Sequence, residues 1–264
     1  MKSFERLSDK LARGDMSQGY FFNMLNRCEY LGDTEINDIE SLNCLGLDTS
    51  LKRDFITLNT RRRFWQEQKF CVVDIETNNG PLSDSRIIEI GAVMLKNGEV
   101  LDEFHSLVYA PALNEMIVNL TGITEEMLKD APSEAGTLEK FRLFLGNSVF
   151  VAHNVEFDYT FLSHAFIRHG FAPLLNRKVC TIKFAMRTIE AQRYGLQTMR
   201  EVLGIAEHIP HRALWDARSA AEVFRLACKN LPPNIKSTED LIRFTKENPT
   251  KAALVKQPRL NLEG

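Results

Sequence analysis

Apolar residues near the start of the chain recur at helical spacing. Phe4, Leu7 and Leu11 fall on one face of "SFERLSDKLARG", and Gly14 follows as its C-terminal stop. "SQGYFFNMLNRCEYLGD" predicts a second, more apolar helix, and "EINDIESLNCLGLD" is compatible with a third. We therefore expect residues 1–68 to form a mainly helical N-terminal accessory region.

At Phe70 the pattern changes from helices to strands. "FCVVDI" is typical of a buried strand, and Asn97-Gly98 separates two apolar runs in "RIIEIGAVMLKNGEVLDEFHSLV". An Asn-Gly pair between such runs predicts a hairpin, because both central positions of a type I′ turn need a positive φ. We expect three successive strands in an antiparallel meander.

Helices and strands alternate through the segments that follow. The pattern predicts helices in "LNEMIVNLTGIT", after "DAPSEAG" as far as Gly146, and in "VEFDYTFLSHAFIRHG", "LQTMREVLGI" and "WDARSAAEVFRLACKNL". It predicts strands in "SVFVAHN" and "KVCTIKFAM". This order predicts an α/β fold over residues 69–231, a mixed five-stranded sheet flanked by helices, followed by a C-terminal tail over 232–264.

Composition places the chain among globular proteins and sets few limits on its partners. Hydrophobic residues make up 44% of the 264 residues, and no apolar run reaches the length of a membrane-spanning helix. The charged N-terminus lacks the apolar core of a signal peptide, and five scattered cysteines without a CxxC pair fit reduced thiols. We therefore expect a cytoplasmic protein. The net charge of −2 gives no overall basic footprint; the local cluster Arg61 to Arg63 is either a solvated face or part of a nucleic-acid path.

Two acidic residues stand at the end of the strand that begins at Phe70. Side chains alternate between the two faces of a strand, so Asp74 and Glu76 point the same way. Two carboxylates at one strand end repel each other unless a cation lies between them, and a hard divalent cation prefers oxygen ligands. The alternative is that the strand ends at Asp74 and both side chains are solvated.

Two later segments carry further candidates. In "AHNVEFDYTFL", Asn154 stands at an N-cap position and puts Asp158 near the first turn of a helix, where the helix dipole favours a negative charge. In "HRALWDA", an imidazole from His211 in the loop can reach over a site that Asp216 enters from the helix. Each feature alone is compatible with a capping or solvated residue, but their joint occurrence on a sheet of this type favours one site.

The motifs together resemble those of the DnaQ-like DEDDh 3′–5′ exonucleases, which have a ribonuclease H-like fold. "VVDIETNNG", "AHNVEFD" and "HRALWDA" carry the resemblance, and "IIEIGAV" and "LTGITEEMLKDAP" are also typical of the family. The family includes the epsilon proofreading subunit of bacterial DNA polymerase III and the exonuclease domain of some bacterial replicative polymerases. The resemblance covers residues 69–231 and implies these catalytic residues: Asp74, Glu76, Asp158, His211 and Asp216.

The resemblance implies a phosphodiester hydrolase that uses two metal ions per site, Mg²⁺ or Mn²⁺. Asp74 would bridge both ions. Glu76 and Asp216 would complete the ligands of the first ion, and Asp158 would act on the second. His211 would be the general base for the attacking water, because imidazole groups titrate near neutral pH. A ligand set made only of carboxylates favours Mg²⁺ or Mn²⁺ over zinc.

The resemblance also implies residues that bind the terminal nucleotide of the substrate. Thr77 would offer its backbone N–H to the 3′-hydroxyl, and Thr121 in "LTGIT" corresponds to a position that contacts this nucleotide in the family. His153, Asn154 and Phe157 would flank the same pocket, although Asn154 is equally compatible with capping and Phe157 with core packing. The other histidines stand at no spacing that indicates a role: His105, His164, His169 and His208.

The resulting hypothesis is an exonuclease that trims single-stranded 3′ ends of DNA to nucleoside 5′-monophosphates in proofreading or repair. The expected partners are nucleic-acid 3′ ends and, as further candidates, DNA polymerase subunits, with no membrane contact. Two alternatives stay open: an exoribonuclease with the same five residues, and a non-catalytic module that binds a replicase or a nucleic-acid end. Near the C-terminus, "QPRLNL" (Gln257, Leu260, Leu262) is similar to the Q-x-x-L-x-L segments that bind bacterial sliding clamps.

Overall fold

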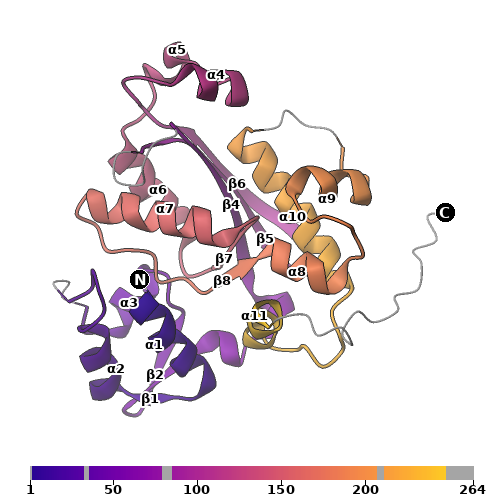
Figure 1. Cartoon of the computed structure of the whole chain (residues 1–264). Helices are drawn as coiled ribbons and strands as arrows, with labels where there is room; N and C mark the ends of the chain where they lie inside the picture. Colours follow the sequence, from indigo (N-terminus) through magenta and orange to yellow (C-terminus); the bar gives the residue numbers. More distant parts are fainter. Residues whose placement is uncertain (1, 33–35, 79–84, 207–210, 248–264) are drawn as a thin grey trace.

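A computed structural model describes residues 2–32, 36–78, 85–206 and 211–247 of the chain. Figure 1 shows a central sheet with helices on both faces and a smaller N-terminal unit beside one end of the sheet. The predicted α/β architecture is confirmed.

Five strands form the central sheet in the order β6-β5-β4-β7-β8. They are β4 (Lys69–Thr77), β5 (Ile87–Lys96), β6 (Glu99–Leu107), β7 (Val149–Ala152) and β8 (Lys178–Cys180). The first three form the predicted antiparallel meander, whereas β7 runs parallel to β4 and β8 parallel to β7. At the hairpin, Asn97 and Gly98 have φ values of 51° and 78°, as a type I′ turn requires.

The helices of the same unit cover both faces of this sheet or lie beyond its ends. They are α4 (Glu115–Thr121), α5 (Glu125–Leu128), α6 (Glu134–Leu145), α7 (Val155–Arg168), α8 (Thr181–Thr188), α9 (Leu196–Leu203), α10 (Ala213–Lys229) and α11 (Thr238–Lys246). Figure 1 shows α6 and α7 on one face and α8, α9 and α10 on the other. The strand predicted in "KVCTIKFAM" is correct only for its first three residues, because from Thr181 onward the buried positions follow helical spacing.

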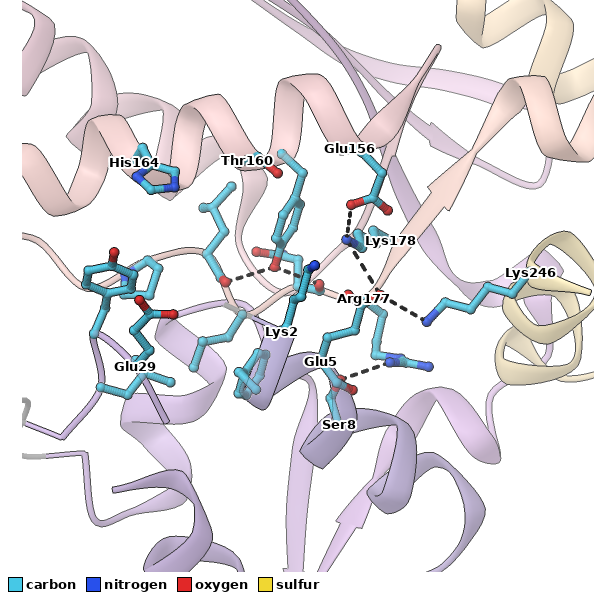
Figure 2. A pocket seen from close by; sticks show the side chains of 18 residues that line it. Lys2, Glu5, Ser8, Glu29, Glu156, Thr160, His164, Arg177, Lys178 and Lys246 are labelled. Atoms are coloured by element: carbon cyan, nitrogen blue, oxygen red, sulfur yellow. Dashed lines mark hydrogen bonds and ion pairs between the residues drawn. The ribbon is translucent and has the colours of Figure 1, made fainter. Parts of the chain in front are cut away.

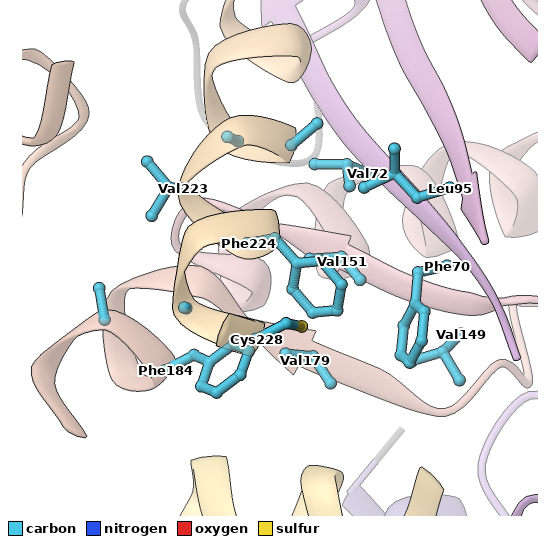
Figure 3. Packing of buried hydrophobic residues seen from close by; sticks show 14 of the residues in the cluster. Phe70, Val72, Leu95, Val149, Val151, Val179, Phe184, Val223, Phe224 and Cys228 are labelled. Carbon is cyan, nitrogen blue, oxygen red and sulfur yellow. The ribbon is translucent and has the colours of Figure 1, made fainter. Parts of the chain in front are cut away.

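The strand β4 is central, and alternate residues along it pack against different helices. Phe70 and Val72 face α10, where Phe224 contacts Phe70 with ring centroids 4.8 Å apart (Figure 3). The intervening apolar residues of β4 pack toward α6 and α7. Asp74 and Glu76 continue the row of Phe70 and Val72, so a strand fixed by two cores positions both carboxylates.

The described residues of the N-terminal region fold into three α-helices and a small antiparallel sheet. The helices are α1 (Lys2–Arg13), which buries Phe4, Leu7 and Leu11 as predicted, α2 (Gln18–Leu25) and α3 (Ile39–Cys44). The strands β1 (Met16–Ser17), β2 (Thr49–Lys52) and β3 (Phe55–Leu58) pair in the order β1-β3-β2. Two 3₁₀ turns, η1 (Asn59–Arg61) and η2 (Trp65–Glu67), lead into β4. The expectation of a mainly helical region therefore missed this sheet.

Buried Arg177, one residue before β8, joins the N-terminal unit to the sheet. Its guanidinium donates two hydrogen bonds of 2.8 Å to Glu239 of α11 and one of 2.8 Å to Asp9 of α1. A cavity of about 390 Å³ adjoins this junction, and Lys178, which lines it, pairs with Glu156 of α7 at 2.9 Å. Figure 2 shows these two side chains directed toward each other. None of the predicted site residues lines this cavity, so the junction is separate from the candidate site.

The helix α11 lies within the predicted C-terminal tail. It packs against α8, β8 and η1, and contributes Leu241, Ile242 and Phe244 to the core under α10. The division into residues 1–68, 69–231 and 232–264 stays a prediction, and Gln257, Leu260 and Leu262 lie outside the described residues.

The described helices include none that combines the length and apolar character needed to span a membrane. The five cysteines are all free thiols, and only Cys44 is exposed.

Candidate active site

The pairing of β4 with β5 gathers carboxylates on one face of the sheet. Asp74 stands opposite Gly91, and Glu76 stands opposite Glu89. Directly paired residues of an antiparallel ladder point to the same side, so Glu89 joins the two predicted acids. The ladder shifts by a bulge directly after Glu76, which ends the regular strand at the site.

Gly91 allows the helix α10 to approach this face. A Cβ atom at Gly91 would lie 2.2 Å from the backbone nitrogen of Leu214 and 2.3 Å from the carbonyl carbon of Ala213. The first turn of α10 therefore crosses β5 directly opposite Asp74, at a point where no side chain separates the backbones. This close approach brings Asp216, in the same first turn, to the carboxylates of β4.

Glu76, His211 and Asp216 converge as predicted. Each offers one ligand atom, and these three atoms lie within 4.8 Å of one another. The backbone N–H of His211 donates to Oδ2 of Asp216 at 3.1 Å, and His211 itself adopts a left-handed conformation with φ of 57°. Its side chain is exposed, so the imidazole lies at the solvent side of the cluster.

Asp158 enters the cluster from the other layer. It lies in the first turn of α7, as predicted, and is 3% exposed. Its carboxylate accepts hydrogen bonds from its own backbone N–H and from that of Ile75. The pairing of β4 with β7 ends at Val72, so the backbone of β4 beyond that point is available to α7.

Burial and mutual repulsion control the charge of the cluster. Burial, followed by the charges of Asp158, Asp216 and Glu76, raises the pKa of Asp74 well above its usual value. Burial and the neighbouring Asp216 raise the pKa of Glu76 to about 8. Burial also raises the pKa of Asp158 to about 8, against the two backbone hydrogen bonds.

A group of converging carboxyl oxygens whose joint ionisation is opposed by burial and mutual repulsion fits hard divalent cations, because a cation offsets that repulsion. Carboxylates are the ligands that Mg²⁺ and Mn²⁺ prefer, and a bound cation would favour the ionised form of each. The residues able to hold such ions are Asp74, Glu76, Asp158 and Asp216.

Glu89 is part of the site and the sequence motifs did not single it out. Its carboxylate is fully buried and accepts hydrogen bonds from the backbone N–H of Ala213 at 2.8 Å, from Arg212 at 2.9 Å and from His105 at 2.7 Å. Burial opposes its ionisation, but these donors hold the pKa of Glu89 below its usual value. An acid inside the apolar run "IIEIGAV", two residues before Gly91, is the signal that could have identified it.

Two of the predicted substrate residues lie beside Asp158. Phe157 is 49% exposed and rests its ring on that of Phe161 at 5.9 Å, so the core-packing interpretation of Phe157 is wrong. Asn154 occupies the N-cap position of α7 with φ of 79°, but its side chain makes no capping hydrogen bond. The capping interpretation of the Asn154 side chain is therefore wrong as well.

The remaining predicted substrate residues are placed differently. Thr77 is half-buried at the end of β4, directly after Glu76. His153 is bonded through Nδ1 to the hydroxyl of Thr181 at 2.8 Å, and burial, with the nearby charge of Arg200, lowers its pKa to about 4. Thr121 is buried at the end of α4, where its hydroxyl donates to the carbonyl of Ile117 at 2.8 Å.

Comparison with known proteins gives matches over the part of the chain that contains this site. Residues 71–224 match the family model described as "Exonuclease". The DNA polymerase III PolC-type of Staphylococcus haemolyticus is 36% identical over 162 residues, and that of Staphylococcus aureus is 35% identical over the same length. The match covers 60% of this chain and 11% of each relative, so the chain corresponds to a small part of those proteins.

Solved structures with the same fold include complexes with DNA. The zinc-bound form of an Escherichia coli ExoI–ssDNA complex has a TM-score of 0.57 at 16% identity, covering 63% of this chain and 42% of the other. Escherichia coli exonuclease I in complex with a dT13 oligonucleotide has a TM-score of 0.55 at 18% identity, covering 62% and 42%. At 16% and 18% sequence identity, these matches show that the chain shares the fold of exonuclease I and nothing more specific.

Proposed function

The chain belongs to the exonuclease family, and from this premise we propose that it is a metal-dependent 3′–5′ exonuclease acting on single-stranded DNA. It would hydrolyse the terminal phosphodiester bond, release nucleoside 5′-monophosphates, and serve proofreading or repair. The match to PolC-type polymerases and the fold shared with an exonuclease that binds single-stranded DNA favour DNA as the substrate. One observation carries the proposal: at the end of the central strand β4, Glu76, His211 and Asp216 converge, and the charges of Asp158, Asp216 and Glu76 act on Asp74.

The four carboxylates would hold two divalent ions, Mg²⁺ or Mn²⁺. Asp74 is close enough to Asp158, Asp216 and Glu76 for the charge of each to raise its pKa, which suits it to contribute to both ion sites. When bound, the ions would neutralise the scissile phosphate and lower the pKa of a coordinated water. The protein holds these oxygen atoms close together on rigid elements. Apolar cores on both faces fix β4, and α10 packs directly against Gly91.

His211 would accept the proton of the attacking water. Its backbone is anchored to Asp216, while its exposed imidazole can pass the proton on to solvent. General-base assistance of this kind contributes roughly 10²–10⁴-fold to a rate, so His211 contributes to the chemical step without being required for metal binding.

Phe157 and Thr77 would receive the 3′-terminal nucleotide. The half-exposed ring of Phe157 adjoins Asp158 and is backed by Phe161, which suits it to stack on a base. Thr77 would direct its backbone N–H to the 3′-hydroxyl, and His153 and Asn154 would flank the same pocket. Thr121 has the least support, because its buried hydroxyl is already bonded within its own segment.

The proposal is tested with 5′-labelled single-stranded DNA incubated with Mg²⁺ and then with EDTA. We expect a ladder that shortens one nucleotide at a time in Mg²⁺ and no cleavage in EDTA. Internal cuts, or shortening from the 5′ end of a 3′-labelled strand, would contradict the polarity. An RNA strand of the same sequence forms the third arm, and faster degradation of RNA would move the assignment to an exoribonuclease.

Two histidine variants separate chemistry from folding. His211→Ala is expected to lower the cleavage rate roughly 10²–10⁴-fold. His164→Ala is the matched control, because His164 lies on α7 against Tyr30 and lines the cavity at the N-terminal junction, which contains none of the cluster residues. Equal rates for the two variants would contradict the role of His211.

A further inference from the structure

Arg200 is a buried cation that binds one of the cluster's carboxylates. It lies in the last turn of α9 and is 7% exposed, beside α10 (Figure 1). Its Nε donates to the hydroxyl of Ser219 at 2.9 Å, and its Nη2 pairs with Oδ1 of Asp216. Asp216 and Ser219 are one helical turn apart on α10, so one guanidinium binds both.

The contact with Arg200 completes the fixation of Asp216. Oδ1 is paired with Arg200 and Oδ2 accepts the backbone N–H of His211, so both oxygens have a protein partner before any ligand binds. Asp74 is in a different position, because the charges acting most strongly on it are those of other carboxylates. Within the cluster, the positive charge of Arg200 therefore acts in direct contact on Asp216, whereas Asp74 is surrounded mainly by other carboxylates.

The charge of Arg200 has two opposite consequences. In the metal-free protein it compensates Asp216 and keeps the end of α9 attached to α10. When a divalent cation approaches the same carboxylate, a guanidinium in contact with Asp216 repels it. The group that stabilises the metal-free site thus also weakens its affinity for metal.

We propose that Arg200 is a positioning residue that serves as an internal counter-cation for Asp216 and sets the affinity of the cluster for divalent ions. The inference rests on the proposed function, because it takes Asp216 as a metal ligand. In the sequence, Arg200 lies on the same helix face as Leu196, Met199 and Leu203. An apolar residue is usual at such a position, so the buried charge of Arg200 is exceptional there.

The test measures Mn²⁺ binding without substrate, by calorimetry, together with the melting temperature in EDTA and in saturating Mn²⁺. Arg200→Gln removes the charge and is expected to tighten the dissociation constant about tenfold, with a lower melting temperature in EDTA and a larger rise on adding Mn²⁺. Arg200→Lys keeps the charge and is expected to keep the wild-type constant. An unchanged or weaker constant in Arg200→Gln would overturn the proposal.

Two further variants keep the result interpretable. Ser219→Ala removes the hydroxyl that accepts from Nε of Arg200 and donates to the carbonyl of Trp215. The guanidinium can then move away from Asp216, and Mn²⁺ binding is expected to tighten in the same direction. If Arg200→Gln does not fold, an unchanged constant in Ser219→Ala overturns the proposal. Arg177→Gln removes a buried ion pair at the N-terminal junction and is expected to lower the melting temperature equally with and without Mn²⁺.

Failure of the proposed metal site gives a different result from failure of this inference. Wild-type protein is expected to bind Mn²⁺, and Asp74→Asn is expected to lose that binding. Absence of binding in the wild type would overturn the site together with the role of Arg200. Wild-type binding that is lost in Asp74→Asn but unchanged in Arg200→Gln and Ser219→Ala would overturn the role of Arg200 alone.

Discussion

The carboxyl group of Glu76 makes the metal-free protein sensitive to pH. Burial and Asp216 raise its pKa from 4.5 to about 8, so the folded protein keeps a proton that the unfolded chain has lost. The stability from this bound proton is complete below pH 4.5 and is lost as the pH rises through 8.

We expect Glu76→Gln to flatten the pH dependence of unfolding in EDTA. Between about pH 5 and 8 the free energy of unfolding of the wild type should fall more steeply, by about 1.4 kcal/mol per pH unit, than that of the variant. Urea titrations at several pH values measure this difference. Glu139→Gln, on the exposed face of α6, is the control, and parallel profiles for Glu76→Gln and wild type would contradict the assignment.

Glu89 holds the start of α10 against β5, so its charge matters although it lies outside the predicted motif. Glu89→Gln leaves Arg212 and the backbone N–H of Ala213 with a neutral partner in a buried place. We expect a loss of about 3 kcal/mol in the free energy of unfolding and a lower cleavage rate.

The control for Glu89→Gln is an ion pair that joins the neighbouring strand β6 to α10 at the surface. Glu103 pairs with Arg218 of α10 while half-exposed, and Glu103→Gln is expected to cost no more than about 1 kcal/mol. Equal losses in the two variants, measured by chemical denaturation, would contradict the anchoring role of Glu89.

Sequence reasoning at the residue scale identified groups whose chemistry is visible in their type and spacing. The cluster of Glu76, His211 and Asp216 was found in this way and does converge. Glu89 and Arg200 could not be found in the same way, because their roles depend on which helix lies over β5 and which lies beside α10. That information comes from packing between elements that are far apart in the sequence.

The contact between α10 and β5 is the element-scale feature on which the site depends. Gly91→Ala would place a Cβ 2.2 Å from the backbone nitrogen of Leu214. Relieving this clash requires the backbone of a packed helix to move, which costs free energy. We expect the variant to lose about 1–3 kcal/mol of unfolding free energy and most of its cleavage activity, since α10 and Asp216 must shift.

Gly19→Ala is the matched control for this substitution. Gly19 lies in α2 with no atom within 4 Å of an added Cβ, so alanine there is expected to be neutral or slightly stabilising. Thermal melts and cleavage rates of the two variants are compared under the same conditions. Retained activity in Gly91→Ala would show that the close approach of α10 is not needed.

Elements with strong periodicity were predicted well, and weak signals account for the rest. The meander is marked by Asn97-Gly98, and α10 by its length and the prolines that follow it. The β2–β3 hairpin was missed because its strands have four residues each and its turn places Arg53 at φ of 54°, where Asn or Gly is usual. Only tertiary contacts favour such a turn.

At the scale of the whole molecule, the N-terminal unit and the sheet share buried contacts. Arg177 pairs with both Asp9 of α1 and Glu239 of α11, and Leu175 belongs to the N-terminal core. The N-terminal unit is therefore attached by charge and by apolar packing together.

We expect the described parts of the chain to unfold in one cooperative transition. Far-UV circular dichroism reports on all helices, whereas Trp65 and Trp215 report on regions outside the N-terminal helices, so coincident urea curves would show a single transition. Arg177→Gln leaves buried Glu239 without its charged partner and is expected to separate the two curves. Separate transitions already in the wild type would contradict the coupling.

The central claim is that the carboxylate cluster performs metal-dependent hydrolysis, and Asp74 is its common member. The most direct measurement compares the cleavage of 5′-labelled single-stranded DNA by wild type and by Asp74→Asn in Mg²⁺, with both proteins shown to be folded by circular dichroism. Asparagine keeps the shape of the side chain and removes its charge, so wild type should shorten the strand stepwise from the 3′ end while Asp74→Asn leaves it at full length. Cleavage at the wild-type rate by folded Asp74→Asn would contradict the account.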